Sequence, residues 1–415
     1  MTNLELNLAE HIWWQVYPLG ATGAPIRNRP SDGSDAGHRI LRLVNWLDYA
    51  AELGVTGLLL GPVFESTAHG YDTLDHFAID SRLGTEGDMQ VLIDEARARG
   101  IDVVFDGVFN HVCVHHDFVK YGGPVKRNGD GQLADWEGDG TLAELDHDDP
   151  RTVDFVVDVM NFWLDRGIAG WRLDVAYDVP TWFWQQVTDR VRERHPNAYF
   201  LGEMIHGDYA QFAHDAKLDT MTQYEVWHAV WNSVAQHNFW ELDHALQRHQ
   251  EFSSRNLMQT FVGNHDVSRI ASTTGDAGAA LAAVVLLTIP GLPSIYYGDE
   301  QAFRGEKGEG WEADDALRPE LPDYPDQLFG FGHWMFKLYR ELIHLRKTNP
   351  WIATADVCIS HFVDQQIAYH VSTNGHDLRV KLQLRDQATK VKLHLDGELY
   401  LKREFYNAEA KAVAV

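Results

Sequence analysis

Short, continuous apolar runs alternate along this chain with segments of helical periodicity. Val55–Leu60 and Ile101–Val108 are two such runs, and apolar residues recur at helical spacing between them, across residues 89–96. Unbroken apolar runs are typical of buried parallel strands, which need crossover helices between them. The alternation therefore predicts an α/β fold, a (β/α)8 TIM barrel. Its expected strands are Ile12–Pro18, Val55–Leu60, Ile101–Val108, Gly170–Ala176, Ala198–Glu203, Thr220–Tyr224, Leu257–Gly263 and Pro293–Tyr297.

Two parts of the chain depart from this alternation. The stretch from Asn110 to Pro150 is rich in His, Gly and Asp and far exceeds the usual length of a βα loop. From Trp351 onward, short runs alternate between apolar and polar residues, which is typical of antiparallel strands. We expect barrel parts at residues 1–110 and 150–350, a short inserted loop subdomain at 111–149 and a small C-terminal β-domain at 351–415.

Composition narrows the class of protein. The net charge of -26 disfavours nucleic acid and anionic membranes as partners. Cys113 and Cys358 are the only cysteines, too few for a disulfide framework, which favours a cytoplasmic protein. Met1–Glu10 has no basic or apolar run of the kind a signal peptide needs, and no apolar run reaches about 20 residues, so we expect no membrane partner. The 14 Trp, 15 Tyr and 19 Phe favour sugars, because aromatic faces stack on sugar rings.

The predicted strand Gly170–Ala176 carries two charges among apolar residues. Arg172 and Asp174 are two positions apart, so their side chains should share one face of the strand. Buried charges are tolerated when they are paired. A structural ion pair and a catalytic carboxylate explain this stretch equally well.

Polar side chains also follow three other predicted strands. Asp106, Asn110 and His111 follow the third strand, Glu203 ends the fifth, and the triplet 264–266 (Asn-His-Asp) ends the seventh. A strand-end Asp alone could simply cap a helix. Several strands that bring carboxylates or imidazoles to one rim favour an active site at the carboxyl end of the barrel.

The same segments carry motifs in a fixed order. They are Asp106–His111 (Asp-Gly-Val-Phe-Asn-His), Gly170–Asp174 (Gly-Trp-Arg-Leu-Asp), Gly202–Met204 around Glu203, and Phe261–Asp266, preceded by His69–Asp72 (His-Gly-Tyr-Asp). In these motifs the chain resembles the α-amylase family of glycoside hydrolases (glycoside hydrolase family 13), over about residues 11–350. The resemblance implies an enzyme, a retaining glycosidase that acts on α-glucans.

Residue by residue, the resemblance implies that Asp174 is the nucleophile, Glu203 the general acid/base and Asp266 the third carboxylate, which holds substrate hydroxyls. Retaining hydrolysis needs one ionised and one protonated carboxyl group. We expect Arg172 to keep Asp174 ionised and the crowded Glu203 to hold the proton. The implied substrate-binding residues are Tyr71, Asp72, His111, Arg172, His265 and Arg318.

One departure from the family pattern bears on the substrate. Typical α-amylases have Lys-His shortly after the nucleophile, whereas this chain has Val175, Ala176 and Tyr177. In this respect it resembles neopullulanases, cyclomaltodextrinases and maltogenic amylases, which favour short or cyclic maltodextrins. The insertion after Asn110 is also short for the family, so we expect no required metal and no cofactor.

Other functions remain open at this point. A transglycosylase or a trehalose- or sucrose-related isomerase of the same family would share these motifs, and a sugar-binding protein without activity would share the fold. A metal hydrolase that uses His111, His115 and His116 lacks the expected His-x-His on the first strand. The expected partner is a small oligosaccharide, with a homodimer possible.

Overall fold

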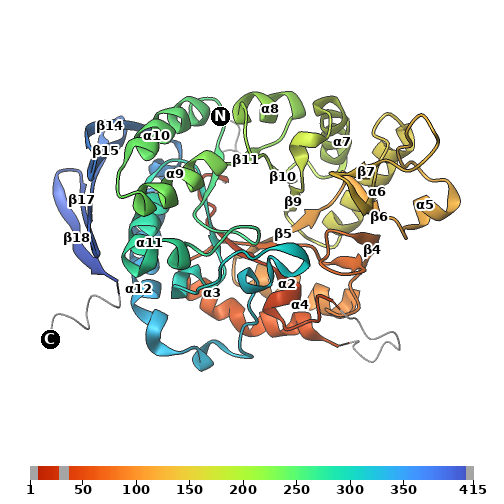
Figure 1. Ribbon diagram of the computed structural model, residues 1–415, viewed down its shortest axis with the longest axis horizontal. Coiled ribbons are helices and arrows are strands. Elements are labelled where there is room, and N and C mark those ends of the chain that lie inside the picture. The colour runs from red at the N-terminus through yellow and green to blue at the C-terminus, as the bar shows by residue number, and fades with distance from the viewer. Residues whose placement is uncertain (1–7, 28–36, 408–415) are drawn as a thin grey trace.

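The computed structural model describes residues 8–27 and 37–407 and confirms the TIM barrel (Figure 1). Residues 1–7, 28–36 and 408–415 lie outside the described residues, and they include most of Met1–Glu10, the segment on which the signal-peptide expectation rests. The parallel strands close in the order β1-β13-β12-β11-β10-β9-β5-β2. They are β1 (Trp13–Val16), β2 (Gly57–Leu60), β5 (Asp102–Gly107), β9 (Gly170–Leu173), β10 (Tyr199–Gly202), β11 (Thr220–Thr222), β12 (Met258–Phe261) and β13 (Leu292–Tyr296).

The barrel strands are apolar throughout because they are covered on both faces. A compact cluster of large buried side chains from five of the strands fills the barrel interior: Trp13, Leu59, Val104, Tyr199, Leu201 and Leu292. The other side chains of the strands pack outward against the helices. The interior is therefore a packed core, and the functional groups are confined to the ends of the strands.

Two of the long helices around the barrel begin at capping residues in the sequence. Thr85 forms a capping box at the start of α4, and Asp149 caps α6 just before Pro150. The helix expected from Ile40 to Leu53 is instead a 3-10 segment, Arg39–Trp46, that continues into a short α3. The helices are α2 (Pro18–Ala21), α3 (Leu47–Leu53), α4 (Glu86–Ala98), α5 (Asp117–Tyr121), α6 (Pro150–Leu164), α7 (Thr181–Arg194), α8 (Tyr209–Ala216), α9 (Tyr224–Ala235), α10 (Trp240–Ser253), α11 (Ile270–Thr288) and α12 (His333–Thr348).

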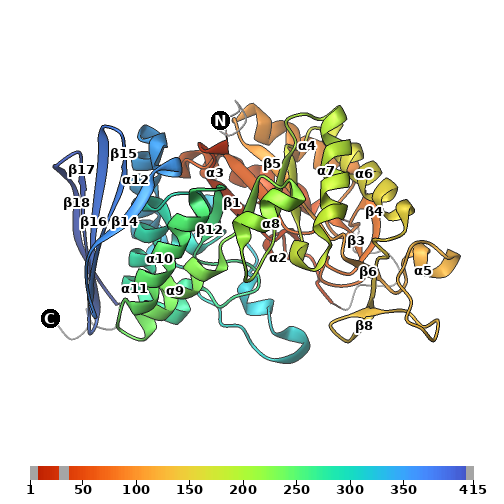
Figure 2. The same cartoon turned by 90° about the horizontal axis from the view of Figure 1, so that it is seen from above.

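Two smaller units lie at opposite ends of the molecule (Figures 1 and 2). The insertion after β5 forms a three-stranded sheet in the order β6-β8-β7, with the short helix α5 beside it. After α12 comes an antiparallel sheet of five strands in sequence order, which contacts α10 and α11. The smaller strands are β3 (Phe64–Ser66), β4 (Thr73–Ile79), β6 (His111–Cys113), β7 (Asp135–Trp136), β8 (Asp139–Glu144), β14 (Asp356–Val363), β15 (Gln366–Thr373), β16 (His376–Arg385), β17 (Ala388–Leu395) and β18 (Glu398–Tyr406).

Helix α11 is the most apolar of the described helices that cover the barrel. By length and composition alone it could cross a membrane, with a mean hydropathy of 1.6, but 78% of that stretch is buried inside the protein. It packs against α9, α12 and the C-terminal sheet. Its apolar character is therefore explained by its position as a core helix between the barrel and that sheet.

Just after β13, Glu300 supplies a pH-dependent contribution to stability. It is buried, and it accepts hydrogen bonds from the Tyr49 hydroxyl at 2.9 Å and from the Gly298 N–H at 2.9 Å. Burial raises its pKa from the ordinary 4.5 to about 7. The folded state then holds a proton that the unfolded chain releases, so stability falls as the pH rises from 4.5 to about 7.

We expect Glu300→Gln to remove this dependence. At about 1.4 kcal/mol per pH unit, the wild type should lose up to about 3 kcal/mol of unfolding free energy across that window, relative to the variant. Denaturant unfolding of both proteins between pH 4.5 and 8 measures the difference. A difference that does not change with pH would contradict the assignment, whatever the absolute stability of the variant.

Candidate active site

One guanidinium lies at the centre of the carboxyl end of the barrel. Strands β5 and β9 pair with Asp106 opposite Arg172, so both side chains enter the site at one level. Arg172 Nη1 lies 2.7 and 2.6 Å from the two Asp106 oxygens and 3.1 Å from Asp174 Oδ1, while Nη2 lies 2.8 Å from Glu203 Oε1. Arg172 and these three carboxylates are all less than a tenth exposed. A single cation therefore neutralises part of a buried cluster of three carboxyl groups.

The chain turns sharply at the end of β9. The strand expected to reach Ala176 ends at Leu173, and a 3-10 turn begins at Ala176. Val175 has a φ of 49° and a ψ of 37°, the left-handed conformation that a β-branched residue rarely adopts. This conformation points the Val175 N–H at Glu203 Oε2, 3.0 Å away. The backbone beside Asp174 thus helps to position Glu203.

Glu203 is held by three donors. Besides Arg172 and the Val175 N–H, the Tyr224 hydroxyl donates to Oε1 at 3.1 Å, and Asn264 Nδ2 donates to the Tyr224 oxygen at 2.9 Å. The sequence did not assign Tyr224 to the site, because a Tyr at the end of a predicted strand gives no signal of its own. These three donors fix the orientation of the Glu203 carboxyl group.

Burial opposes the expected ionisation of Asp174. It raises the pKa of Asp174 well above its usual range, opposed by Arg172 and reinforced by the nearby Glu203 and Asp106. Burial likewise raises the pKa of Asp106 to about 6, against the effect of Arg172. Arg172 therefore offsets only part of the effect of burial on Asp174, because its guanidinium is shared among three carboxylates.

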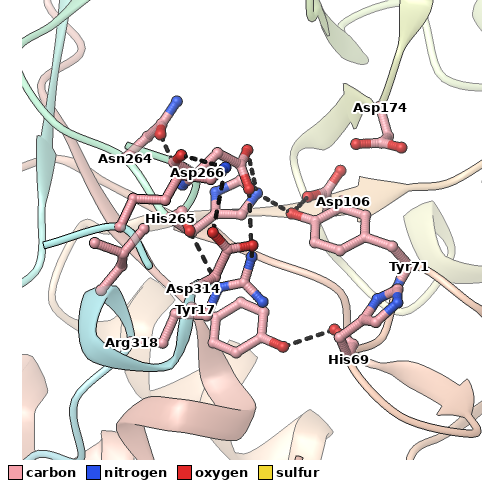
Figure 3. Close-up of polar contacts among 12 residues, drawn as sticks. Tyr17, His69, Tyr71, Asp106, Asp174, Asn264, His265, Asp266, Asp314 and Arg318 are labelled. Atoms are coloured by element: carbon pink, nitrogen blue, oxygen red, sulfur yellow. Dashed lines mark hydrogen bonds and ion pairs between the residues drawn. The ribbon is translucent and has the colours of Figure 1, made fainter. Parts of the chain in front are cut away.

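On the other side of the site, Tyr71, His265 and Asp266 form a connected group (Figure 3). The Tyr71 hydroxyl contacts His265 Nε2 and donates to Asp106 Oδ2 at 3.1 Å. His265 Nε2 also lies 3.0 Å from Asp266 Oδ2, and the Tyr71 and His265 rings stack at 5.3 Å between centroids. Burial lowers the pKa of His265 well below its usual range, so this ring is neutral and donates one N–H. Asp266 is less buried than Asp174 and is open to a ligand.

Arg318 reaches the same group from the segment after β13. Its Nε donates to the His265 carbonyl at 3.1 Å, and its Nη2 lies 3.3 Å from Asp266 Oδ1 and 3.0 Å from Asp314 Oδ2 (Figure 3). The guanidinium lies over the Tyr17 ring, 4.5 Å from its centroid. Asp314 and Tyr17 were not predicted; the spacing of Asp314 four residues before Arg318 is the one signal that could have indicated an ion pair.

The inserted subdomain contributes one wall of the site. His111 Nε2 lies 3.1 Å from the Tyr71 carbonyl, and Trp136 stacks on the His111 ring at 4.8 Å. Trp136 Nε1 in turn donates to Asp178 Oδ2 at 3.0 Å, which links the insertion to the turn after β9. Nothing in the sequence around Trp136 indicated this role.

Asp72 has a different environment from the other candidates. Its carboxylate accepts hydrogen bonds from the backbone of Thr67, Ala68 and Gly70 at 3.1, 2.7 and 3.1 Å, and it is 3% exposed. These contacts organise the loop that carries Tyr71. Direct contact of Asp72 with substrate stays a prediction.

Within residues 8–27 and 37–407, no group of three or more His, Cys, Asp or Glu side chains is placed to hold a metal ion. Asn110, the residue that would serve a calcium site, has its Nδ2 3.4 Å from His111 Nδ1. The absence of a required metal stays a prediction.

We expect chelation with EDTA to leave activity largely intact. Ca²⁺ prefers six to eight oxygen ligands, and the insertion after Asn110 is short for such a cage. Initial rates before and after exhaustive dialysis against EDTA measure the effect. A loss of activity that added calcium restores would contradict this expectation.

The barrel, the inward carboxylates and the neighbouring imidazoles define a glycosidase site. The model of the α-amylase catalytic domain matches residues 27–137 and 137–320, so this chain belongs to the α-amylase family and is a glycosidase. Neopullulanase 2 of Thermoactinomyces vulgaris is 29% identical over 413 residues, which cover 89% of this chain and 68% of that protein. The maltogenic α-amylase of Bacillus acidopullulyticus is 26% identical, over 96% of this chain and 73% of its own length.

Solved structures share the fold. The ligand-free cyclic α-maltosyl-(1→6)-maltose hydrolase of Arthrobacter globiformis superposes with a TM-score of 0.78 at 23% identity, over 97% of this chain and 99% of that one. A debranching enzyme of Nostoc punctiforme, soaked with acarbose, gives a TM-score of 0.75 at 24% identity, over 93% and 91% of the two chains. At these identities the comparison concerns the architecture alone.

Proposed function

We propose that this glycosidase hydrolyses α-glucosidic bonds in short or cyclic maltodextrins, with retention, through a covalent glycosyl-enzyme on Asp174. The observation that carries the proposal is the shared guanidinium of Arg172, which contacts Asp174 and Glu203 together. Two carboxyl groups on one guanidinium lie close together, as retaining chemistry requires. The names of relatives such as neopullulanase 2 and the cyclomaltodextrinase of Thermoanaerobacter pseudethanolicus support this substrate class.

The proposed reaction has two steps. Asp174 attacks the anomeric carbon while the bond to the leaving sugar breaks, and Glu203 transfers its proton to the departing oxygen. Water then attacks the same carbon, gives a proton to Glu203 and releases Asp174. Asp266, with His265 beside it at 3.0 Å, holds hydroxyls of the reacting sugar.

A product profile tests the proposal. We expect kcat/KM to be higher on maltotriose and β-cyclodextrin than on soluble starch, because this chain lacks the Lys-His pair after Asp174 and the insertion walls one side of the site. Pullulan and panose would distinguish α-1,4 from α-1,6 cleavage. Better turnover of starch would contradict the substrate class. Isomerised sucrose or trehalose would favour an isomerase, long transfer products a transglycosylase, and binding of maltotriose without products a sugar-binding protein.

The cellular compartment of the enzyme and its binding partner are also proposals. Cys113 is buried, Cys358 is exposed, and both are free thiols, which supports a reducing compartment; we propose the cytoplasm. The proposed partner is the oligosaccharide itself. A homodimer stays a prediction, which sedimentation of the purified protein would test.

A further inference from the structure

Helix α9 carries an aromatic face beside the catalytic groups. Tyr224, Trp227 and Trp231 are spaced by three and four residues, so they lie along one side of the helix. Their ring centroids are 5.8 Å apart for Tyr224 and Trp227 and 6.1 Å for Trp227 and Trp231. Phe261 of β12 supports the row from beneath, stacked on Trp227 at 6.3 Å. Tyr224 is buried and Trp231 packs against the core, but Trp227 and Trp231 are only partly buried and keep exposed surface.

A hollow lies on each side of Trp227. The first, of about 400 Å³, is bordered by Ile205, Tyr224 and the polar residues Glu225, His228 and Arg248. The second, of about 310 Å³, is bordered by Trp231, Asp266, Ser268 and Lys307. One hollow therefore reaches Tyr224, which donates to Glu203, and the other reaches Asp266 itself. The aromatic row is continuous with the active site.

The position of Glu203 indicates that the aromatic row lies on the side of the site where the leaving group binds. A general acid protonates the departing oxygen, so the sugars that leave must lie next to it. Tyr224 contacts Glu203, and Ile205 follows Glu203 by two residues. Arg318, Tyr17 and His69 lie on the side of His265 (Figure 3).

On the leaving-group side of the site, the turn after Asp174 lacks the Lys-His pair with which typical α-amylases contact the sugars. The residues after Asp174 are instead Val175, Ala176, Tyr177 and Asp178. The aromatic row on α9 is a surface beside Glu203 that can replace that contact.

We propose that Trp227 and Trp231 form the platform that binds the leaving-group glucose units, and the acceptor sugars in any transfer reaction. The C–H groups on the flat face of a glucose ring carry partial positive charge and pack well on the negative face of an indole. The inference rests on the proposed function, since it assumes Glu203 as the general acid.

The test compares two substrates that differ only in what leaves. α-Maltosyl fluoride transfers a maltosyl unit to Asp174, and so does maltotetraose when it is cleaved into two maltoses. Only maltotetraose has leaving sugars that the platform can bind. The ratio of kcat/KM for maltotetraose to that for the fluoride should fall about tenfold in Trp227→Ala, the usual scale for an aromatic anchor, and several-fold in Trp231→Ala. Because both rates come from one preparation, the ratio does not depend on the fraction that folds.

Two controls sharpen the outcome. Trp240→Ala removes a 61% exposed Trp on α10, which packs on Phe362 of the C-terminal sheet, and should leave the ratio as in the wild type. Trp227→Leu preserves much of the packing on Phe261 and should still lower the ratio. Added maltose should speed breakdown of the glycosyl-enzyme formed from the fluoride in the wild type, and less in Trp227→Ala.

The test distinguishes failure of the platform proposal from failure of the proposed function. A ratio within twofold of the wild type in both Ala variants, with an active wild type, would overturn the platform and leave the proposed function standing. An equal loss on both substrates would overturn it too. A wild type that turns over neither substrate would overturn the proposed function, and the platform with it.

Discussion

The variant Glu203→Gln should accumulate a maltosyl adduct on Asp174 when it is given α-maltosyl fluoride. Fluoride leaves with little help from an acid, so the first step still proceeds, whereas attack by water lacks its base. On maltotriose the same variant should lose roughly 10²–10⁴-fold in kcat, the typical value of general acid assistance. Intact mass spectrometry followed by peptide digestion would detect the adduct and locate it.

Asp174→Asn is the matched comparison. It removes the nucleophile, so it should be inactive on both substrates and form no adduct, while Tyr224 and Val175 still hold Glu203. Added azide, which needs no base, should release the maltosyl group from the Glu203→Gln adduct as an α-azide. A sugar attached elsewhere, or a β-configured first product from the wild type, would contradict the retaining mechanism.

Arg172→Leu should strongly destabilise the folded protein. It removes a cation that contacts Asp106, Asp174 and Glu203, all of them buried. Leaving buried charge without its partner typically costs about 3–5 kcal/mol of unfolding free energy. The folded-state pKa values of Asp106 and Asp174, already raised, should rise further, so the loss should grow as pH increases from about 4 through neutrality.

Denaturant unfolding at pH 4.5 and 8 measures this effect. Arg190→Leu is a suitable control, because Arg190 is 43% exposed and its pair with Asp154 at 2.7 Å lies on the surface; such pairs contribute about 0–1 kcal/mol. The double variant Arg172→Leu/Asp106→Asn should recover part of the loss at pH 8. A loss from Arg172→Leu no larger than that of the control would show that the cluster tolerates its charge without Arg172.

The barrel could be predicted from sequence because its strands are buried on both faces. Continuous runs such as Leu58–Leu60 cannot be accommodated in an exposed sheet, and a Gly such as Gly54, with a φ of 102°, ends a helix predictably. The C-terminal sheet was only partly predicted. Its three central strands show the alternation, whereas β14 and β18 at the edges expose more of both faces and lose the period.

The site was predicted only as far as its motifs extend. Strand ends place Asp174, Glu203 and Asp266 on one rim whatever the details of packing. How the Glu203 carboxyl group is held depends on donors outside the motifs, such as the Tyr224 hydroxyl and the Val175 backbone. No periodicity or composition reports those contacts.

Because Val175 adopts a left-handed conformation, selection for thermal stability and selection for catalytic rate should favour different residues at this position. A valine in this conformation costs on the order of 1–3 kcal/mol, which a glycine would largely recover. The flexible glycine would no longer hold its amide on Glu203 Oε2 as firmly. Laboratory evolution that rewards heat resistance alone should therefore drift toward glycine at this position, while evolution that rewards rate should keep the strained residue.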